Sequence, residues 1–304
     1  MDVYLPIANL AVNVLVIVGL GVLTGILSGM FGVGGGFLTT PLLIFYGVPP
    51  TVAAASSATQ VTGASVSGVF AHGRRGGVDY QMGAVMVAGG VLGTLIGAFL
   101  FELFTALGQI DTLINILYVG LLGSIGWFMA RDAWRALSAQ RTGNPLPARK
   151  RRHHPLVANL PLRWRFYRSG LYISPLAPLL LGMLTGILTM LMGIGGGFVL
   201  VPAMLYILGM SGNVVVGTSL FQILFTTIAS TLMHSLTTHA VDLVLAALLL
   251  LGSVTGAQVG ARLALKIPAE RLRLVLAVLV LLVALRMGLG LTYRPEAIYT
   301  VSPL

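Results

Sequence analysis

Apolar residues fill most of the chain in long blocks that are separated by short polar or glycine-rich breaks. A helix needs about 20 apolar residues to cross the hydrocarbon core of a bilayer, and several of the blocks have that length. The blocks lie roughly at 10–28, 30–48, 51–71, 79–101, 111–131, 173–191, 194–209, 213–236, 242–262 and 271–291. This pattern predicts an all-α, polytopic membrane protein.

The composition agrees with that prediction. The chain has 304 residues, of which 57% are hydrophobic and 9% are charged, and this leaves too little polar surface for a soluble protein of that size. No basic residue precedes the first apolar block, so we expect no signal peptide and expect the first helix to remain in the mature protein.

A glycine-rich motif occurs twice and shows that the chain is an internal duplication. Residues 32–37 read GVGGGF, and residues 193–198, which lie 161 positions later, read GIGGGF. Residues 21–41 and 182–202 are identical at 12 of 21 positions, which is too many for two unrelated apolar segments. We therefore expect one transmembrane domain made of two repeats, 1–131 and 173–304, joined by a basic cytoplasmic linker, 132–172.

Loop charges predict the orientation, because loops rich in Lys and Arg face the cytoplasm. In the first half, the loop with Arg74 and Arg75 is basic, whereas the loop 102–111 has acids and no bases. In the second half the order is reversed, since the loop at 237–239 has no Lys or Arg and the segment 262–273 is basic. An odd number of crossings per repeat explains this reversal and predicts inverted repeats. The prediction holds whether each glycine segment is a re-entrant hairpin or a link between two full spans.

The doubled glycine motif is the main candidate for a binding site. Each glycine inside a helix costs about 1 kcal/mol relative to alanine, so we expect the helix to break there and a new one to begin near Phe37 and near Phe198. A helix start presents free N–H groups and a partial positive charge, which suits an anion. The predicted site comprises Gly34, Gly35, Gly36, Phe37, Gly195, Gly196, Gly197 and Phe198. The alternative is that these glycines only permit tight helix crossings.

Glycines spaced four apart have a different interpretation. They occur at 89, 93 and 97 in the first half and at 252, 256 and 260 in the second. This spacing is typical of close helix–helix packing in membranes, so we expect a structural role for both sets.

A polar set recurs in the block that follows each glycine motif. Hydroxyl and amide side chains inside an apolar span need partners, and they would bind substrate or bond neighbouring helices. Because the set is repeated, we expect it to line the site: Ser56, Ser57, Gln60, Thr218, Ser219 and Gln222.

Four titratable residues, also paired by the repeat, are candidates for proton coupling: His72, His234, Asp79 and Asp242. The histidines alternatively mark ordinary membrane boundaries. The aspartates each begin a helix, for which N-capping is the favoured interpretation. With no cysteine in the chain, disulfides and cysteine-bound metal are excluded, and we expect neither a metal nor a cofactor.

The motifs GVGGGFLTTP and GIGGGFVLVP, followed by ASSATQ and GTSLFQ, resemble the sulfite exporter TauE/SafE family of membrane permeases. The resemblance spans both halves and implies transport of small, often sulfur-containing anions across the bacterial inner membrane, driven by an ion gradient. One of the differences between the repeats replaces a glycine of the first half, since Met190 stands where the first half has Gly29.

We therefore expect a secondary transporter that works by alternating access, and not an enzyme. The alternatives are an anion channel that uses the same half-helices, a transporter of a small carboxylate without sulfur, and an intramembrane enzyme or scaffold. No nucleotide-binding GxxxxGK[ST] loop occurs. The expected partners are the small anion and the lipid bilayer, without nucleic acid, and a homodimer is left open.

Overall fold

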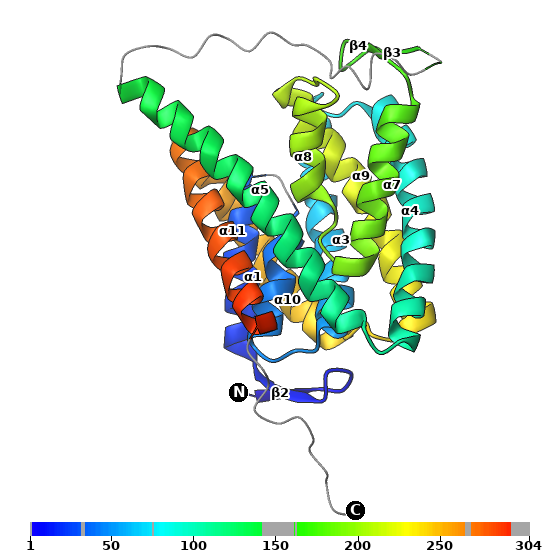
Figure 1. Ribbon diagram of the computed structural model, residues 1–304, viewed down its shortest axis with the longest axis vertical. Coiled ribbons are helices and arrows are strands. Elements are labelled where there is room, and N and C mark those ends of the chain that lie inside the picture. The colour runs from blue at the N-terminus through cyan, green and yellow to red at the C-terminus, as the bar shows by residue number, and fades with distance from the viewer. Residues whose placement is uncertain are drawn as a thin grey trace, which may run out of the picture.

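The computed structural model describes residues 2–31, 34–74, 76–141, 161, 163–264 and 269–292. The first half begins with a two-stranded antiparallel hairpin and continues in helices α1 to α5 (Figure 1). Its elements are β1 (Asp2–Leu5), β2 (Leu10–Asn13), α1 (Val14–Phe31), α2 (Gly36–Phe45), α3 (Pro50–Arg74), α4 (Tyr80–Ala106) and α5 (Ile110–Arg141).

The second half repeats this order of elements. It comprises β3 (Trp164–Phe166), β4 (Leu171–Ile173), α7 (Leu176–Met192), α8 (Gly197–Tyr206), α9 (Gly212–Met233) with the π-helical turn η1 (His234–Thr238), α10 (Leu243–Ala264) and α11 (Ala269–Thr292). The two β-hairpins lie at opposite ends of the helical bundle in Figure 1.

The lengths of the helices fit a bilayer. Among the described residues, α4, α5, α9 with η1, α10 and α11 each contain a stretch long and apolar enough to cross a membrane. Helix α3 has 25 residues and therefore reaches about 37 Å, which is also a crossing length. The expected all-α membrane protein is confirmed.

Helices α2 and α8 are half-length and fold back on the helix before them. Each has 10 residues, or about 15 Å, which is half of the hydrocarbon thickness. The backbone N–H of Asn13, just before α1, donates to the hydroxyl of Tyr46, just after α2, across 3.3 Å. Both ends of this helix pair therefore lie on the same side, so the first glycine segment is a re-entrant hairpin and not a link between full spans.

The second helix pair closes in the same way. Phe166 and Leu171 of the β3–β4 hairpin, which precedes α7, are buried in one cluster with Met204 near the end of α8 and Leu208 just after it. The beginning of α7 and the end of α8 thus share one end of the bundle, and Figure 1 shows α8 rising beside α7.

The helices of the two halves are interleaved through glycine faces. Helix α1 packs along α10, and α7 packs along α4. A Cβ atom added to Gly93 would lie 2.0 Å from the backbone oxygen of Met183, and one added to Gly256 would lie 2.3 Å from that of Val22. The predicted packing role of the four-apart glycines is confirmed, since only glycine permits this approach.

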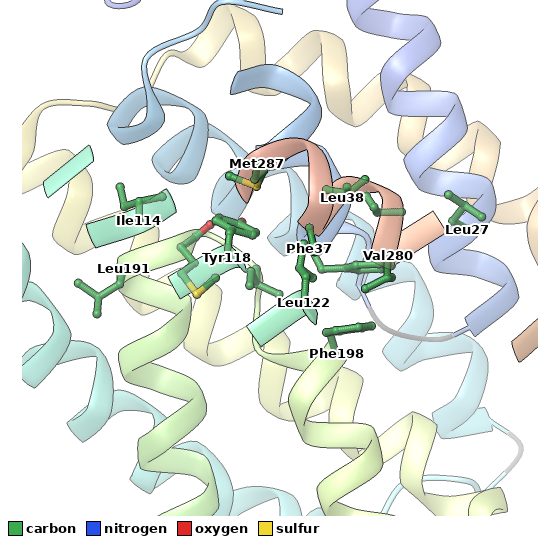
Figure 2. Packing of buried hydrophobic residues seen from close by; sticks show 14 of the residues in the cluster. Leu27, Phe37, Leu38, Ile114, Tyr118, Leu122, Leu191, Phe198, Val280 and Met287 are labelled. Carbon is green, nitrogen blue, oxygen red and sulfur yellow. The ribbon is translucent and has the colours of Figure 1, made fainter. Parts of the chain in front are cut away.

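Helices α5 and α11 cross beside the glycine segments and enclose the largest apolar cluster. Tyr118, Leu122 and Val280 of this cluster surround Phe37 and Phe198 (Figure 2). The segment expected as a linker contains the end of α5 and the β3–β4 hairpin, while its basic run 149–154 lies outside the described residues.

Candidate functional site

Both glycine segments make a left-handed turn that starts a new helix. Gly34 and Gly35 have φ values of 87° and 74°, and Gly195 and Gly196 have φ values of 73° and 74°. Residues with a side chain rarely adopt this region, which explains why the motif needs adjacent glycines. Gly35 is the N-cap of α2 and Gly196 is the N-cap of α8, so the helices start just before Phe37 and Phe198, as expected. Gly32 and Val33 lie outside the described residues.

The first turns of α2 and α8 are buried. The first N–H groups of any helix have no partner within that helix, and together they carry a partial positive charge. Gly36, Phe37, Gly197 and Phe198 are all buried. These starts are therefore enclosed by protein, where low polarity strengthens their attraction for an anion.

The two helix starts meet. The rings of Phe37 and Phe198 stack with their centroids 4.7 Å apart and their planes 8° from parallel, and Figure 2 shows the two rings facing each other. A Cβ atom added to Gly36 would lie 2.7 Å from the backbone oxygen of Gly193. Residues 161 positions apart in sequence are thus in contact between the halves.

Two apolar side chains related by the repeat cover the glycine turns. Val61 of α3 and Ile223 of α9 are 162 positions apart, and both are fully buried. A Cβ atom on Gly34 would lie 3.4 Å from Val61 and 3.7 Å from Ile223, and one on Gly195 would lie 2.8 Å and 3.1 Å from the same side chains. The two turns are therefore closed by a shared apolar layer.

Part of the repeated polar set is buried without a partner. The amide oxygens of Gln60 and Gln222 and the hydroxyl of Ser57 make no hydrogen bond, although all three residues are at most 1% exposed. The Gln222 amide nitrogen donates to the hydroxyls of Thr185 and Thr226 across 3.2 Å and 2.8 Å. Buried polar atoms usually have a hydrogen-bond partner, so these three atoms are candidates for contact with a polar ligand.

Other members of that set have structural partners. The hydroxyl of Ser219 donates to the backbone oxygen of Val216 across 2.9 Å. Ser56 accepts a bond from the N–H of Asp242 across 3.1 Å, and Thr218 accepts one from the N–H of Asp79 across 2.9 Å. Ser56 and Thr218 thus hold the starts of α10 and α4.

Asp79 and Asp242 are capping residues, as favoured from the sequence. The Oδ1 atom of Asp79 accepts from the N–H of Met82 across 3.0 Å, and its Oδ2 atom accepts from the N–H and hydroxyl of Ser169 in the β3–β4 turn. For Asp242, Oδ1 accepts from the N–H groups of Val244 and Leu245, and Oδ2 accepts from that of Ile7 in the β1–β2 turn. Each aspartate therefore fastens a β-hairpin to a helix start.

The paired histidines occupy different surroundings. His234 is fully buried, with Nε2 2.9 Å from the backbone oxygen of Met190 and Nδ1 3.3 Å from the hydroxyl of Thr238. Its ring stands edge-on to Phe101 at 5.0 Å. His72 is half-buried near the end of α3, and its backbone oxygen accepts from Gly77. His234 lies beside α7, which leads into the second glycine turn.

Two buried polar groups in the first half were not found from the sequence. The Tyr118 hydroxyl donates to the backbone oxygen of Met192 at the end of α7 across 2.6 Å, and the Thr40 hydroxyl on α2 is buried beside that of Tyr118. Counting 161 positions from Thr40 gives Val201, and counting 163 positions from Tyr118, the offset that pairs Asp79 with Asp242, gives Leu281. Because the second half has an apolar residue at both positions, the repeat gave no signal for either residue.

Known proteins resemble this chain along most of its length. The probable membrane transporter protein YjnA of Bacillus subtilis is 26% identical over 271 residues, which cover 89% of this chain and 98% of that protein. A probable membrane transporter protein of Xylella fastidiosa strain Temecula1 is 29% identical over 262 residues, which cover 85% and 88%. The sulfite exporter TauE/SafE family protein 6 of Arabidopsis thaliana is 48% identical over 48 residues, or 16% of this chain and 11% of that protein.

No solved structure matches the chain. Residues 17–287 match the sequence model of the family described as Sulfite exporter TauE/SafE, a range that includes both glycine segments and both covering side chains. The chain is therefore a membrane transporter that belongs to the sulfite exporter TauE/SafE family.

Proposed function

We propose that this protein is a secondary transporter that moves a small sulfur-containing anion, such as sulfite or a sulfonate, across the bacterial inner membrane. The observation that carries the proposal is the meeting of the α2 and α8 starts at Phe37 and Phe198. The sulfur comes from the family description and from the name of the Arabidopsis relative.

The site suits an anion because its attraction comes from backbone groups. The N-terminus of one helix stabilises a nearby negative charge by about 0.3–1 kcal/mol when it is exposed and by up to about 2 kcal/mol when it is partly buried. The N-termini of α2 and α8 would both contribute to the binding of one anion. Gln60 and Gln222 add polar groups, since a glutamine amide carries an acceptor and two donors that exchange places when the amide turns over. A small oxyanion would bind to the amides of both halves with these side chains beside it.

Alternating access between inverted repeats is the proposed mechanism. It is supported by the packing of each half on the other, in which α1 of the first half packs on α10 of the second and α7 of the second half packs on α4 of the first. The layer of Val61 and Ile223 closes the glycine turns. Rocking of one repeat against the other would part this layer and open the site to one side of the membrane at a time.

His234 is the residue that we propose for proton coupling. Both of its ring nitrogens face oxygen atoms, Met190 O and Thr238 Oγ1, so the ring could carry a second proton without losing a hydrogen bond. Asp79 and Asp242 already accept backbone N–H bonds in their capping roles. The coupled proton would therefore be bound next to α7 and not at the helix caps.

The proposal is tested by transport in proteoliposomes. We expect saturable sulfite uptake that speeds up when unlabelled sulfite is present on the opposite side, whereas current without saturation would indicate a channel. Thermal unfolding with sulfite, thiosulfate, taurine and small carboxylates identifies the substrate class, since a ligand of the folded state raises the unfolding midpoint.

A matched pair of glycine variants tests the site itself. Gly36→Ala puts a methyl group within 3 Å of the backbone oxygen of Gly193, and it should abolish uptake by forcing the two helix starts apart. Gly123→Ala on α5 is the control, because a Cβ atom there meets nothing within 4 Å. If the Gly36→Ala protein takes up sulfite at the full rate and has an unchanged unfolding midpoint, the substrate does not bind at these helix starts.

A further inference from the structure

The outer face of the β3–β4 hairpin carries exposed aromatic rings around an arginine. Tyr167 is 77% exposed and Tyr172 is 59% exposed, while Trp164, which strand alternation places on the other face beside Phe166, is 51% exposed. Arg165 pairs with Tyr172 across the two strands, so their side chains share one face. The Arg165 guanidinium also lies over the Tyr167 ring, 5.6 Å from its centroid. An arginine is thus held between two exposed tyrosines.

The opposite face of this hairpin fixes it to the helical bundle. Phe166, Leu171 and Ile173 are buried against α4, α8 and α9. Ser169 bonds Asp79 at the start of α4, and the Arg168 guanidinium donates to the backbone oxygens of Gly76 and Val78 across 3.2 Å. The outer face is therefore an ordered platform that needs little rearrangement to bind a ligand.

The position of the hairpin places this platform at the membrane surface. It lies where α4 begins, and α4 has 27 residues, enough to cross the bilayer. Trp and Tyr are enriched at that depth, where one end of the ring is apolar and the other is hydrated. The loop charges described above predict that this end faces the cytoplasm, whose leaflet contains anionic lipids.

The β1–β2 hairpin at the other end has the opposite character. Residues 2–13 contain one acid, Asp2, and no Lys or Arg. Its exposed Tyr4 is engaged with Asn9, whose side-chain oxygen accepts the tyrosine hydroxyl across 2.7 Å. The two hairpins occupy equivalent positions in the two halves, but only the β3–β4 hairpin has an arginine flanked by exposed aromatic rings.

We propose that the outer face of the β3–β4 hairpin binds the phosphate of an anionic phospholipid headgroup. Arg165 provides the charge, since a guanidinium bonds phosphate oxygens through two N–H groups, and Tyr167 and Tyr172 hold it in place. Because Ser169 of the same hairpin is bonded to Asp79, whose N–H donates to Thr218, a lipid bound here also steadies the starts of α4 and α9.

The test uses the purified full-length protein in detergent, without a transport substrate. Phosphatidylglycerol should raise the thermal unfolding midpoint more than phosphatidylcholine does, because the bound lipid favours the folded state. Arg165→Gln should weaken the apparent affinity for phosphatidylglycerol about fivefold, which corresponds to the ~1 kcal/mol expected for one basic side chain near an anionic surface. Arg131→Gln, on the exposed side of α5, is the charge-matched control and should leave the affinity unchanged.

Three outcomes would overturn the proposal. Equal shifts with the two lipids would show that charge is not recognised, and an undiminished response of Arg165→Gln would place the lipid elsewhere. A shift produced by inorganic phosphate alone would show a site for a soluble anion. If Arg165→Gln proves unstable, lipid adducts counted by native mass spectrometry on the unmodified protein give the same comparison of the two lipids.

Discussion

The hydroxyl of Tyr118 donates a hydrogen bond to the backbone oxygen of Met192, with 2.6 Å between the two oxygen atoms. Met192 is the last residue of α7, directly before the second glycine turn. In the second half, the offset of 163 that pairs Asp79 with Asp242 puts Leu281 in the place of this tyrosine, and leucine has no hydroxyl to donate. The second glycine turn is thus tied to α5, and Leu281 cannot form the corresponding bond to the first.

Replacing Tyr118 with phenylalanine should destabilise the protein by about 1–3 kcal/mol. The reason is that the buried oxygen of Met192 would lose its partner while the ring still fills its space. Unfolding of the purified protein measures the change, with Tyr172→Phe on the exposed hairpin face as the control. Equal stability of the two variants would mean that the hydroxyl does not anchor the turn.

The close packing of α4 on α7 is tested by comparing the stability of Gly93→Ala, at a packed position, with that of Gly123→Ala, at an open one. At position 93 the new methyl group would lie 2.0 Å from a backbone oxygen of α7, and backbone cannot move aside as a side chain can. We expect a loss of about 1–3 kcal/mol at position 93, as for other overpacked sites. At position 123 nothing lies within 4 Å, so alanine should raise stability by up to about 1 kcal/mol. Unfolding curves that coincide would contradict the packing of α4 on α7.

Removal of the Asp79 carboxylate should be costly. Asp79→Ala loses the helix cap to Met82 and both bonds to Ser169, and we expect a loss of about 2–3 kcal/mol. Asp132→Ala, at an exposed position of α5, is the control and should change stability by less than about 0.5 kcal/mol. Protease cleavage within the β3–β4 hairpin should also become faster, because its bond to α4 is gone. A hairpin that stays protected would show that the buried apolar face holds it alone.

His234→Gln tests proton coupling. Glutamine keeps polar groups near Met190 and Thr238 but cannot take up a proton as an imidazole can. We expect sulfite uptake by this variant to lose its response to an imposed pH gradient while retaining its response to the sulfite gradient. His72→Gln is the matched control. A variant that still responds fully to pH would assign the coupled proton to another residue.

Much of the fold could be predicted from the sequence, because the glycine patterns that mark it occur in both halves. The adjacent glycines at 34–36 and 195–197 located both helix breaks, and the four-apart glycines predicted close packing. They did not identify the partners, since a glycine face fits any helix with a small or smooth surface. The pairing of α1 with α10 therefore had to be seen in three dimensions.

The residues that the sequence did not reveal are those that break the repeat or lie in short elements. Tyr118 and Thr40 are single polar residues in apolar helices, without counterparts in the second half. The β3–β4 hairpin has strands of three residues inside a segment that looked like linker, and so short a strand has too few positions to show alternation. The stacking of Phe37 on Phe198 depends on how the two halves approach each other, which no local pattern encodes.

The interleaved pairing of the halves has a consequence for biogenesis. Helix α1 begins at Val14 and its packing partner α10 begins at Leu243, so α1 emerges from the ribosome long before the surface that covers its Gly21, Gly25 and Gly29 has been made. During synthesis, these glycines can be covered only by lipid or by the insertion machinery. Final assembly therefore requires both halves and cannot be completed before the last third of the chain has been made. If the protein were cut between its halves, each piece would lack the helices on which its own helices pack, so the two pieces would have to assemble together.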